Sequence, residues 1–183
     1  MERDVLWRAL RAPGLEHLHV SMKSGGLTVT GLIIGVEDGS PFRIGYWVLT
    51  DAGGAVREVQ VQDHLGRVPP VALFADGHGR WIDSDVGELP ALDGCLDVDI
   101  SATPFTNTLP IRRLHLLPGD SCAIHVAYVS VPELVVSREE QVYTCLANDL
   151  YRFESDDFQA DIGVDADGLV VDYPGLFTRI WAG

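Results

Sequence analysis

The sequence predicts an all-β protein, mainly β with one central α-helix. Apolar and polar residues alternate with a period of two almost from end to end, and turn signals rich in Gly and Asp separate the alternating segments. The 183 residues, 46% of them hydrophobic, are enough for one well-filled core and few for two. No linker or charge block interrupts the pattern, which favours a continuous meander closed on itself.

A strongly marked hairpin covers residues 44–62. Its first strand alternates between a face of Ile, Tyr, Val and Thr and a face of Gly, Trp and Leu. On the return strand the alternation places Arg57 on the face of Val59 and Val61, so we expect the Arg57 side chain to point inward. Residues 158–171 alternate in the same way around a DADG turn and predict the last strands.

The segment LDGCLDVDISATPFTNTLPIRRL, residues 92–114, sets charged residues into a stretch that also reads as part of a core. Its first part reads as a strand with Asp97 and Asp99 on one face, about 6.6 Å apart along the strand. Arg112 and Arg113 follow in an apolar context, and a guanidinium that is buried needs a carboxylate or a ligand anion. We therefore expect a short bidentate contact between one of these arginines and one of these aspartates. The alternative is that the aspartates line a solvated face and the arginines extend to water.

One substantial helix is predicted within about residues 106–117. Asn107 or Thr108 suits the N-cap, Pro110 is tolerated in the first turn, and the Pro-Gly pair at 118–119 supplies a stop. Leu and Ile surround the helix axis almost completely, which is typical of a helix buried on most sides.

Four segments carry a resemblance to a known family. They are LDGCLDVDISATPFTNTLPIRRL at 92–114, VPELVV at 131–136, QVYTCL at 141–146 and DGLVVDYPGLF at 167–177. In these the chain resembles the bacterial family of putative glycolipid-binding proteins, and the resemblance covers nearly all of it. It implies a single domain over residues 1–183 with the spiral β-roll fold, a long antiparallel sheet wrapped around one helix. The segment at 51–61 departs from the family, whose members tend to have a tryptophan before the arginine.

The composition argues against several classes of partner. With a net charge of −14, and 13 Lys and Arg against 27 Asp and Glu, the chain is a poor ligand for nucleic acid or an anionic membrane surface. The N-terminus lacks the unbroken apolar core of a secretory signal, and no apolar run approaches a membrane span. Three scattered cysteines, Cys95, Cys122 and Cys145, read as small buried residues and not as a disulfide framework. From these observations we expect a cytoplasmic protein.

Metal, nucleotide and nucleophile motifs are incomplete. His17 and His19 have the H-x-H spacing of a cupin metal site, but the further ligands of that motif are missing, so a hydrogen-bonded or solvent-facing strand pair is favoured. No dinucleotide or Walker glycine loop is present, and Cys145 has no nearby base. We predict no metal or nucleotide cofactor.

Seven polar residues set among apolar ones are the candidate ligand-binding residues. They could form an internal network that orients the helix, or bind a sugar head group or an anionic lipid group against the walls of Trp47, Trp81, Tyr143 and Phe177. In a third interpretation Asp97 and Asp99 are the acid and base of a glycoside hydrolase. The seven are Arg57, Asp97, Asp99, Asn107, Arg112, Arg113 and Tyr173.

Together these features predict a non-catalytic protein that binds a glycolipid or another amphiphile. A spiral sheet that does not close also leaves an edge strand, which two copies can cover, so we expect a homodimer.

Overall fold

The computed structural model describes residues 2–23 and 25–183, and they form one sheet of fifteen strands with a short helix. Neighbouring strands are antiparallel except for β9 and β10, which are parallel. The sheet order is β8-β7-β6-β5-β4-β3-β2-β1-β15-β14-β13-β12-β11-β10-β9. The elements are β1 (Glu2–Ala9), β2 (Gly14–Lys23), β3 (Gly26–Glu37), β4 (Ser40–Thr50), β5 (Val56–Asp63), β6 (Val71–Ala75), β7 (Trp81–Asp83), β8 (Gly87–Glu88), the 3₁₀ turn η1 (Pro90–Leu92), β9 (Asp97–Ile100), the 3₁₀ turn η2 (Phe105–Asn107), α1 (Thr108–Leu114), β10 (Ser121–Val129), β11 (Val136–Ala147), β12 (Leu150–Ser155), β13 (Phe158–Val164), β14 (Val170–Tyr173) and β15 (Phe177–Ala182).

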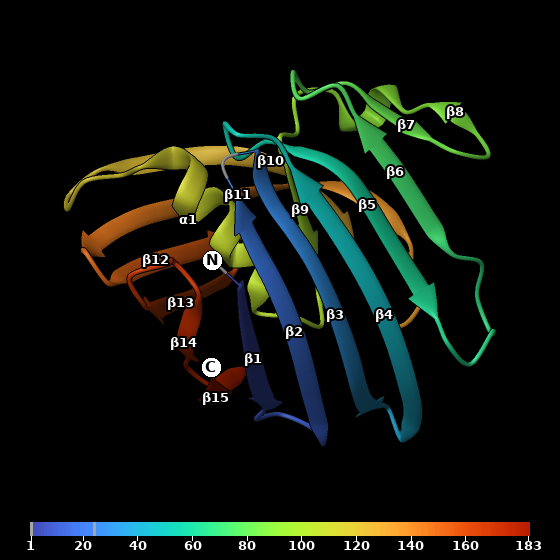
Figure 1. Ribbon diagram of the computed structural model, residues 1–183, viewed down its shortest axis with the longest axis horizontal. Coiled ribbons are helices and arrows are strands. Elements are labelled where there is room, and N and C mark those ends of the chain that lie inside the picture. The colour runs from blue at the N-terminus through green and yellow to red at the C-terminus, as the bar shows by residue number, and fades with distance from the viewer. Residues whose placement is uncertain (1, 24) are drawn as a thin grey trace.

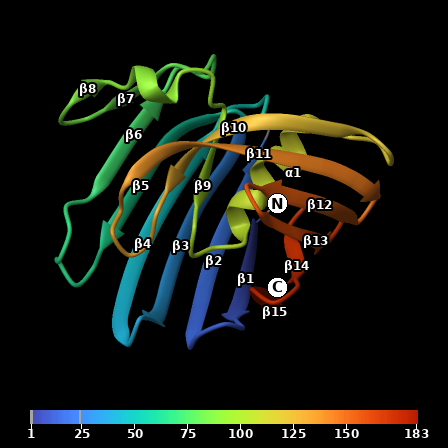
Figure 2. The same cartoon turned by 180° about the vertical axis from the view of Figure 1, so that it is seen from behind.

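The sheet rolls up around α1. Strands β1 to β5 form one curved layer, β10 to β13 cross on the other side, and α1 lies between them (Figures 1 and 2). Strand β9 lies inside the roll, where the Val56 amide at the start of β5 donates to the Leu96 carbonyl at 2.9 Å. The all-β prediction with one central helix is confirmed, at 59% strand and 7% helix. The sheet does not close on itself, because β8 and β9 remain as its two edges.

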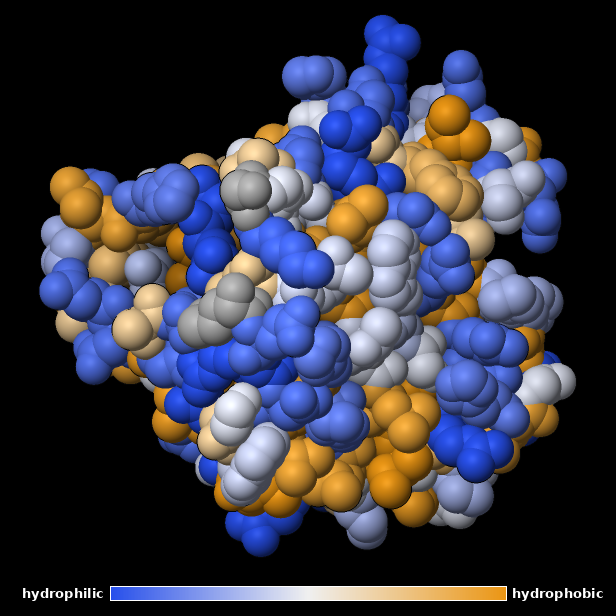
Figure 3. Space-filling view, viewed as in Figure 1, coloured by the Kyte–Doolittle hydropathy of each residue, from blue (hydrophilic) through white to orange (hydrophobic). Residues whose placement is uncertain are grey.

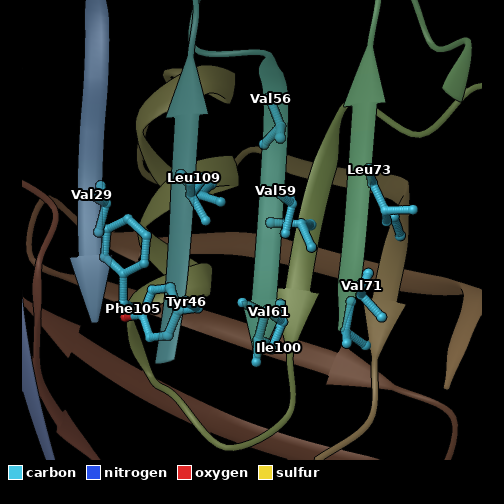
Figure 4. Close-up of a cluster of buried hydrophobic side chains, with 14 of the residues drawn as sticks. Val29, Tyr46, Val56, Val59, Val61, Val71, Leu73, Ile100, Phe105 and Leu109 are labelled. Atoms are coloured by element: carbon cyan, nitrogen blue, oxygen red, sulfur yellow. The ribbon is translucent and has the colours of Figure 1, made fainter. Parts of the chain in front are cut away.

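The interior holds the inward faces of the strands and the apolar side of the helical segment. Phe105 of η2 and Leu109 of α1 point at the side chains of β4 and β5 (Figure 4). The ring of Phe105 stacks on that of Tyr46 with centroids 6.4 Å apart. The helical segment therefore packs in the interior of the roll. Its burial fixes the position of β9 and of the loop between β9 and η2.

The helix is shorter than the sequence predicts. It ends at Leu114, because His115 adopts the left-handed conformation with φ of 50°. His115 and Leu117 beyond it are exposed, Leu117 by 69%, while Leu116 stays partly buried. Leu117 precedes a proline, which disfavours a helical conformation there. The expectation of a buried helix reaching residue 117 was therefore wrong at its C-terminal end.

Arg57 does not point inward. The strand register shifts between Leu49, which faces Glu58, and Thr50, which faces Val56, so Arg57 sits in a β-bulge without a cross-strand partner. The bulge turns the arginine outward while Val56 on one side of it stays buried. The exposed guanidinium donates through Nε to the Ala75 carbonyl at 2.9 Å.

The outer face of the sheet is mixed in polarity. Exposed Leu15, Leu32 and Ile34 lie on β2 and β3, and Figure 3 shows apolar side chains gathered over the lower part of these strands. His17 and His19 are on the same outer face, and both hydrogen-bond Asp4 Oδ1, at 2.9 and 3.2 Å. The predicted hydrogen-bonded strand pair is confirmed.

Two further features bear on the predictions from composition. The cysteines are free, and two of the three are buried. Within the part of the chain that is described, no helix combines the length and the apolar character needed to span a membrane.

Candidate functional site

Two adjoining cavities form a cleft at the end of the roll where the β1–β2 and β3–β4 turns meet the loop after β9. We call the larger, of about 560 Å³, the apolar arm and the smaller, of about 440 Å³, the polar arm. Each lies in the range of roughly 300–1,000 Å³ that is usual for ligand pockets. The arms adjoin because both are lined by Arg11, Ser101, Tyr128, Leu176 and Phe177.

The apolar arm is built mainly from β1, β2, β3 and their turns. Its walls are mostly apolar side chains and glycine backbone, and of the four carboxyl groups that line it Glu16 is buried most completely. The apolar residues include Trp7, Leu15, Ile33, Ile34, Val36, Phe42, Ala102 and Val131.

The polar arm has Asp99 on its wall. The hydroxyl of Thr106 donates to Asp99 Oδ1 and the amide of Gln141 donates to Oδ2, each at 2.7 Å. Burial raises the pKa of the Asp99 carboxyl, and these two hydrogen bonds oppose that rise. Each carboxylate oxygen has two lone pairs, so each keeps one for a ligand donor.

Amide and phenol groups continue this wall. Asn107 Oδ1 accepts from the buried Tyr143 hydroxyl at 2.9 Å, and Asn107 Nδ2 donates to the Pro104 carbonyl at 3.3 Å. Asn107 therefore stands at the N-cap position but uses its side chain for the cleft wall and not for capping. Tyr173 adds a ring that lies edge-on to Phe153 at 6.3 Å.

The remaining four predicted site residues lie outside the cleft. Arg57 is on the outer surface. Arg113 and Asp97 form the predicted ion pair, with Nη2 to Oδ2 at 2.6 Å and Nε to both oxygens at 3.1 Å. Arg112 Nη1 donates to the Asp167 carbonyl at 2.5 Å.

Arg112 lines another cavity, of about 610 Å³, which we call the second cavity. It lies at the opposite end of β2 and β3 from the cleft, between the β4–β5 turn and the β13–β14 turn. The seven predicted residues thus separate into three groups. Asp99, Asn107 and Tyr173 line the polar arm, Asp97 and Arg113 are paired inside the roll, and Arg57 and Arg112 are elsewhere.

The predicted aromatic walls separate in a similar way. Phe177 lines both arms. The indole of Trp81 is buried and donates to the Cys95 carbonyl at 2.9 Å. Tyr143 is buried too, and its hydroxyl donates to Asn107 Oδ1. Trp47 is on the outward-facing side of β4.

Glu16 was missed by the sequence analysis and is the most unusual group of the cleft. It is 2% exposed, and its Oε1 accepts from the Tyr46 hydroxyl at 2.5 Å and the Thr103 hydroxyl at 2.7 Å. Its Oε2 is buried without a hydrogen-bond partner among the described residues. Burial raises the pKa of the Glu16 carboxyl to about 7, against the two hydrogen bonds. A Glu at an inward position, in alternation with Leu18 and Val20, was the available signal.

The comparisons with known proteins place this chain in a family. The model of the family described as "Putative glycolipid-binding" matches residues 4–179. The chain belongs to this family. The structure is also similar to a crystal structure of a DUF1089 family protein from Pseudomonas aeruginosa. The match covers 90% of this chain and 92% of that chain, with 37% sequence identity and a TM-score of 0.80. No protein of curated function matches the sequence significantly.

Proposed function

We propose that the cleft binds an amphiphile of the glycolipid class, with an uncharged, hydroxyl-bearing head group in the polar arm and the hydrocarbon part in the apolar arm. The observation that carries this proposal is that a polar and an apolar cavity adjoin and share five lining residues. A ligand with one polar end and one apolar end satisfies both arms at once, and the family description points to the same chemistry.

The polar arm has the hydrogen-bonding groups that suit a sugar. Asp99 offers free lone pairs to hydroxyl donors, while the amides of Asn107 and Gln141 each have two N–H donors, of which one is used within the protein. The ring of Tyr173, with Phe177 next to it at 6.2 Å, offers an apolar surface to the carbon face of a sugar ring.

The charges around the cleft favour a neutral head group over an anionic one. Arg11 is the one cationic side chain that lines the described part of either arm. Seven carboxyl groups line the same arms, so a phosphate or sulfate would meet a negative field at short range. They are Glu16, Glu37, Asp38, Asp99, Glu133, Glu139 and Asp156.

Binding is better supported than hydrolysis by Asp97 and Asp99. Asp97 is fully buried and both its oxygens face Arg113, whereas Asp99 lines the polar arm. No cavity described above is lined by both carboxylates, so they do not face a common substrate site as an acid and base pair must. The free cysteines agree with a reducing, cytoplasmic location, which forms part of this proposal.

Calorimetric titration with decyl maltoside, decyl sulfate and free maltose tests the proposal. We expect the maltoside to bind, maltose alone to bind much more weakly, and the sulfate to bind less well than the maltoside. Tyr173→Phe removes one hydroxyl from the polar arm, and Ala102→Trp fills part of the apolar arm. Both are expected to weaken binding of the maltoside, by about threefold or more for the loss of a hydrogen bond.

Matched controls lie outside the cleft. Tyr151→Phe makes the same change as Tyr173→Phe beside the second cavity, and Arg57→Ala changes the outer surface. Both should leave the affinity within twofold. Absence of binding by the wild type, or equal losses in Tyr173→Phe and Tyr151→Phe with unchanged melting temperatures, would remove the proposal.

A further inference from the structure

The junction of the two arms contains a carboxyl group whose hydrogen bonding is incomplete. Glu16 lines the apolar arm, while its partner Thr103 lines the polar arm. Its Oε1 is occupied by two hydroxyl donors, and its Oε2 has no partner in residues 2–23 and 25–183. An unpaired buried oxygen is costly, so this atom, in a residue that lines the cavity, points to a missing ligand group.

The neighbours of Glu16 determine where its acid proton resides. Tyr46 and Thr103 both donate to Oε1, and Thr103 Oγ1 in turn accepts the Phe105 amide at 3.0 Å. With Oε1 surrounded by donors, the proton of the acid form lies on Oε2. The raised pKa means that this form is well populated at and below neutral pH. The acid form therefore presents an O–H donor without an acceptor, at the point where head group and hydrocarbon chain would meet.

We propose that Glu16 is a ligand-selecting residue whose protonated carboxyl group donates a hydrogen bond to a neutral acceptor at the linkage of the amphiphile, namely the carbonyl oxygen of an acyl ester or amide. The inference rests on the proposed function. It narrows the ligand class from glycolipids in general to acylated ones, since an alkyl ether linkage offers a poorer acceptor. It also makes recognition dependent on pH, because the ionised carboxylate has no proton to donate and repels a carbonyl oxygen.

Other titratable groups facing this region could also produce a pH dependence. They line the apolar arm together with Glu16 or hydrogen-bond to it, and the described residues that line the cleft include no histidine. The Gln substitution separates Glu16 from all of them, because its amide donates at the position of Oε2 at any pH and keeps an acceptor at Oε1. These groups are Arg11 of the β1–β2 turn, Glu37 of β3, Asp38 of the β3–β4 turn, Tyr46 of β4, Tyr128 of β10 and Glu133 of the β10–β11 loop.

The test compares sucrose monodecanoate, an ester, with decyl maltoside, an alkyl glycoside whose linkage has no carbonyl oxygen, since both carry a disaccharide and a ten-carbon chain. We expect wild-type protein to bind the ester two- to tenfold more tightly than the alkyl glycoside at pH 5.5, and to lose this preference at pH 8.5. Glu16→Gln should keep the preference at both pH values. Glu16→Leu should lack the preference for the ester at both pH values. Circular dichroism and thermal unfolding verify that this variant is folded.

The outcomes separate this inference from the proposed function. If neither detergent binds to wild type at any pH, the proposed function fails and the inference fails with it. If both bind but the ester preference is absent, or is the same at pH 5.5 and 8.5, the Glu16 inference alone is wrong. It is also wrong if Glu16→Gln reproduces the pH dependence of the wild type.

Discussion

Glu16 also gives the protein a pH-dependent stability that can be derived from its environment. Its folded-state pKa of about 7 lies above the ordinary value of 4.5, so between these values the folded state binds more protons at this site than the unfolded state. Stability contributed by this group is therefore greatest near or below pH 4.5 and is lost as pH rises towards 7. Above pH 7 the buried carboxylate is ionised in the folded state and carries its full penalty.

The size of the effect follows from the two pKa values. A difference of about 2.5 pKa units corresponds to roughly 3 kcal/mol between the limits, and about 2–3 kcal/mol of this falls between pH 5 and pH 8. Glu16→Gln cannot ionise and keeps the shape of the acid. We therefore expect the free energy of unfolding of the variant minus that of wild type to increase by about 2–3 kcal/mol from pH 5 to pH 8, so that the variant becomes the more stable of the two by that amount relative to pH 5.

Urea denaturation of both proteins at pH 5, 6, 7 and 8 measures this difference directly. Taking the difference at each pH cancels the titration of the other carboxyl groups, and a constant effect of the amide shifts all the differences equally without changing their dependence on pH. A difference between the two proteins that stays constant across this pH range would refute the reasoning. So would a change of the opposite sign, which would mean that the folded protein stabilises the charged form of Glu16.

Three further predictions concern stability and assembly. Asp97→Asn should lower the free energy of unfolding by about 3 kcal/mol because it leaves Arg113, 15% exposed, without its counter-ion, whereas Arg57→Ala should cost under about 0.5 kcal/mol. Urea midpoints that fall equally in both variants would contradict the buried ion pair. Arg112→Ala should cost about 1 kcal/mol by loss of its bond to the Asp167 carbonyl and leave maltoside affinity unchanged, which titration checks. The open edge at β8 keeps a homodimer as our expectation, and sedimentation showing a monomer at micromolar concentration would overturn it.

The parts of the fold that could be predicted from the sequence depend on local patterns. The first strand of the 44–62 hairpin follows its alternation, with Ile44 and Val48 fully buried. The Arg113–Asp97 ion pair could also be predicted, because a buried arginine in an apolar helix needs a carboxylate and the preceding strand carries two on one face. In both cases the physical requirement is contained within a few residues.

Other features depend on contacts that no local pattern contains. The bulge at Arg57 is a property of the pairing between β4 and β5, and it reverses the direction that simple alternation gives that residue. The partners of Glu16 lie 30 and 87 residues further along the chain, at Tyr46 and Thr103. Gln141, which completes the wall at Asp99 from β11, is 42 residues away. The residues of the cleft therefore meet only in the folded roll, and their proximity could not be predicted from the sequence.

The central claim is that the two arms act together as one site for an amphiphile. A crystal structure of the protein with decyl maltoside bound is its most direct test. The account predicts sugar hydroxyls within hydrogen-bond distance of Asp99 and Gln141, and the alkyl chain alongside Ile33 and Phe42. Detergent found only in the second cavity beside Arg112, or only on the outer face of the sheet, would contradict it.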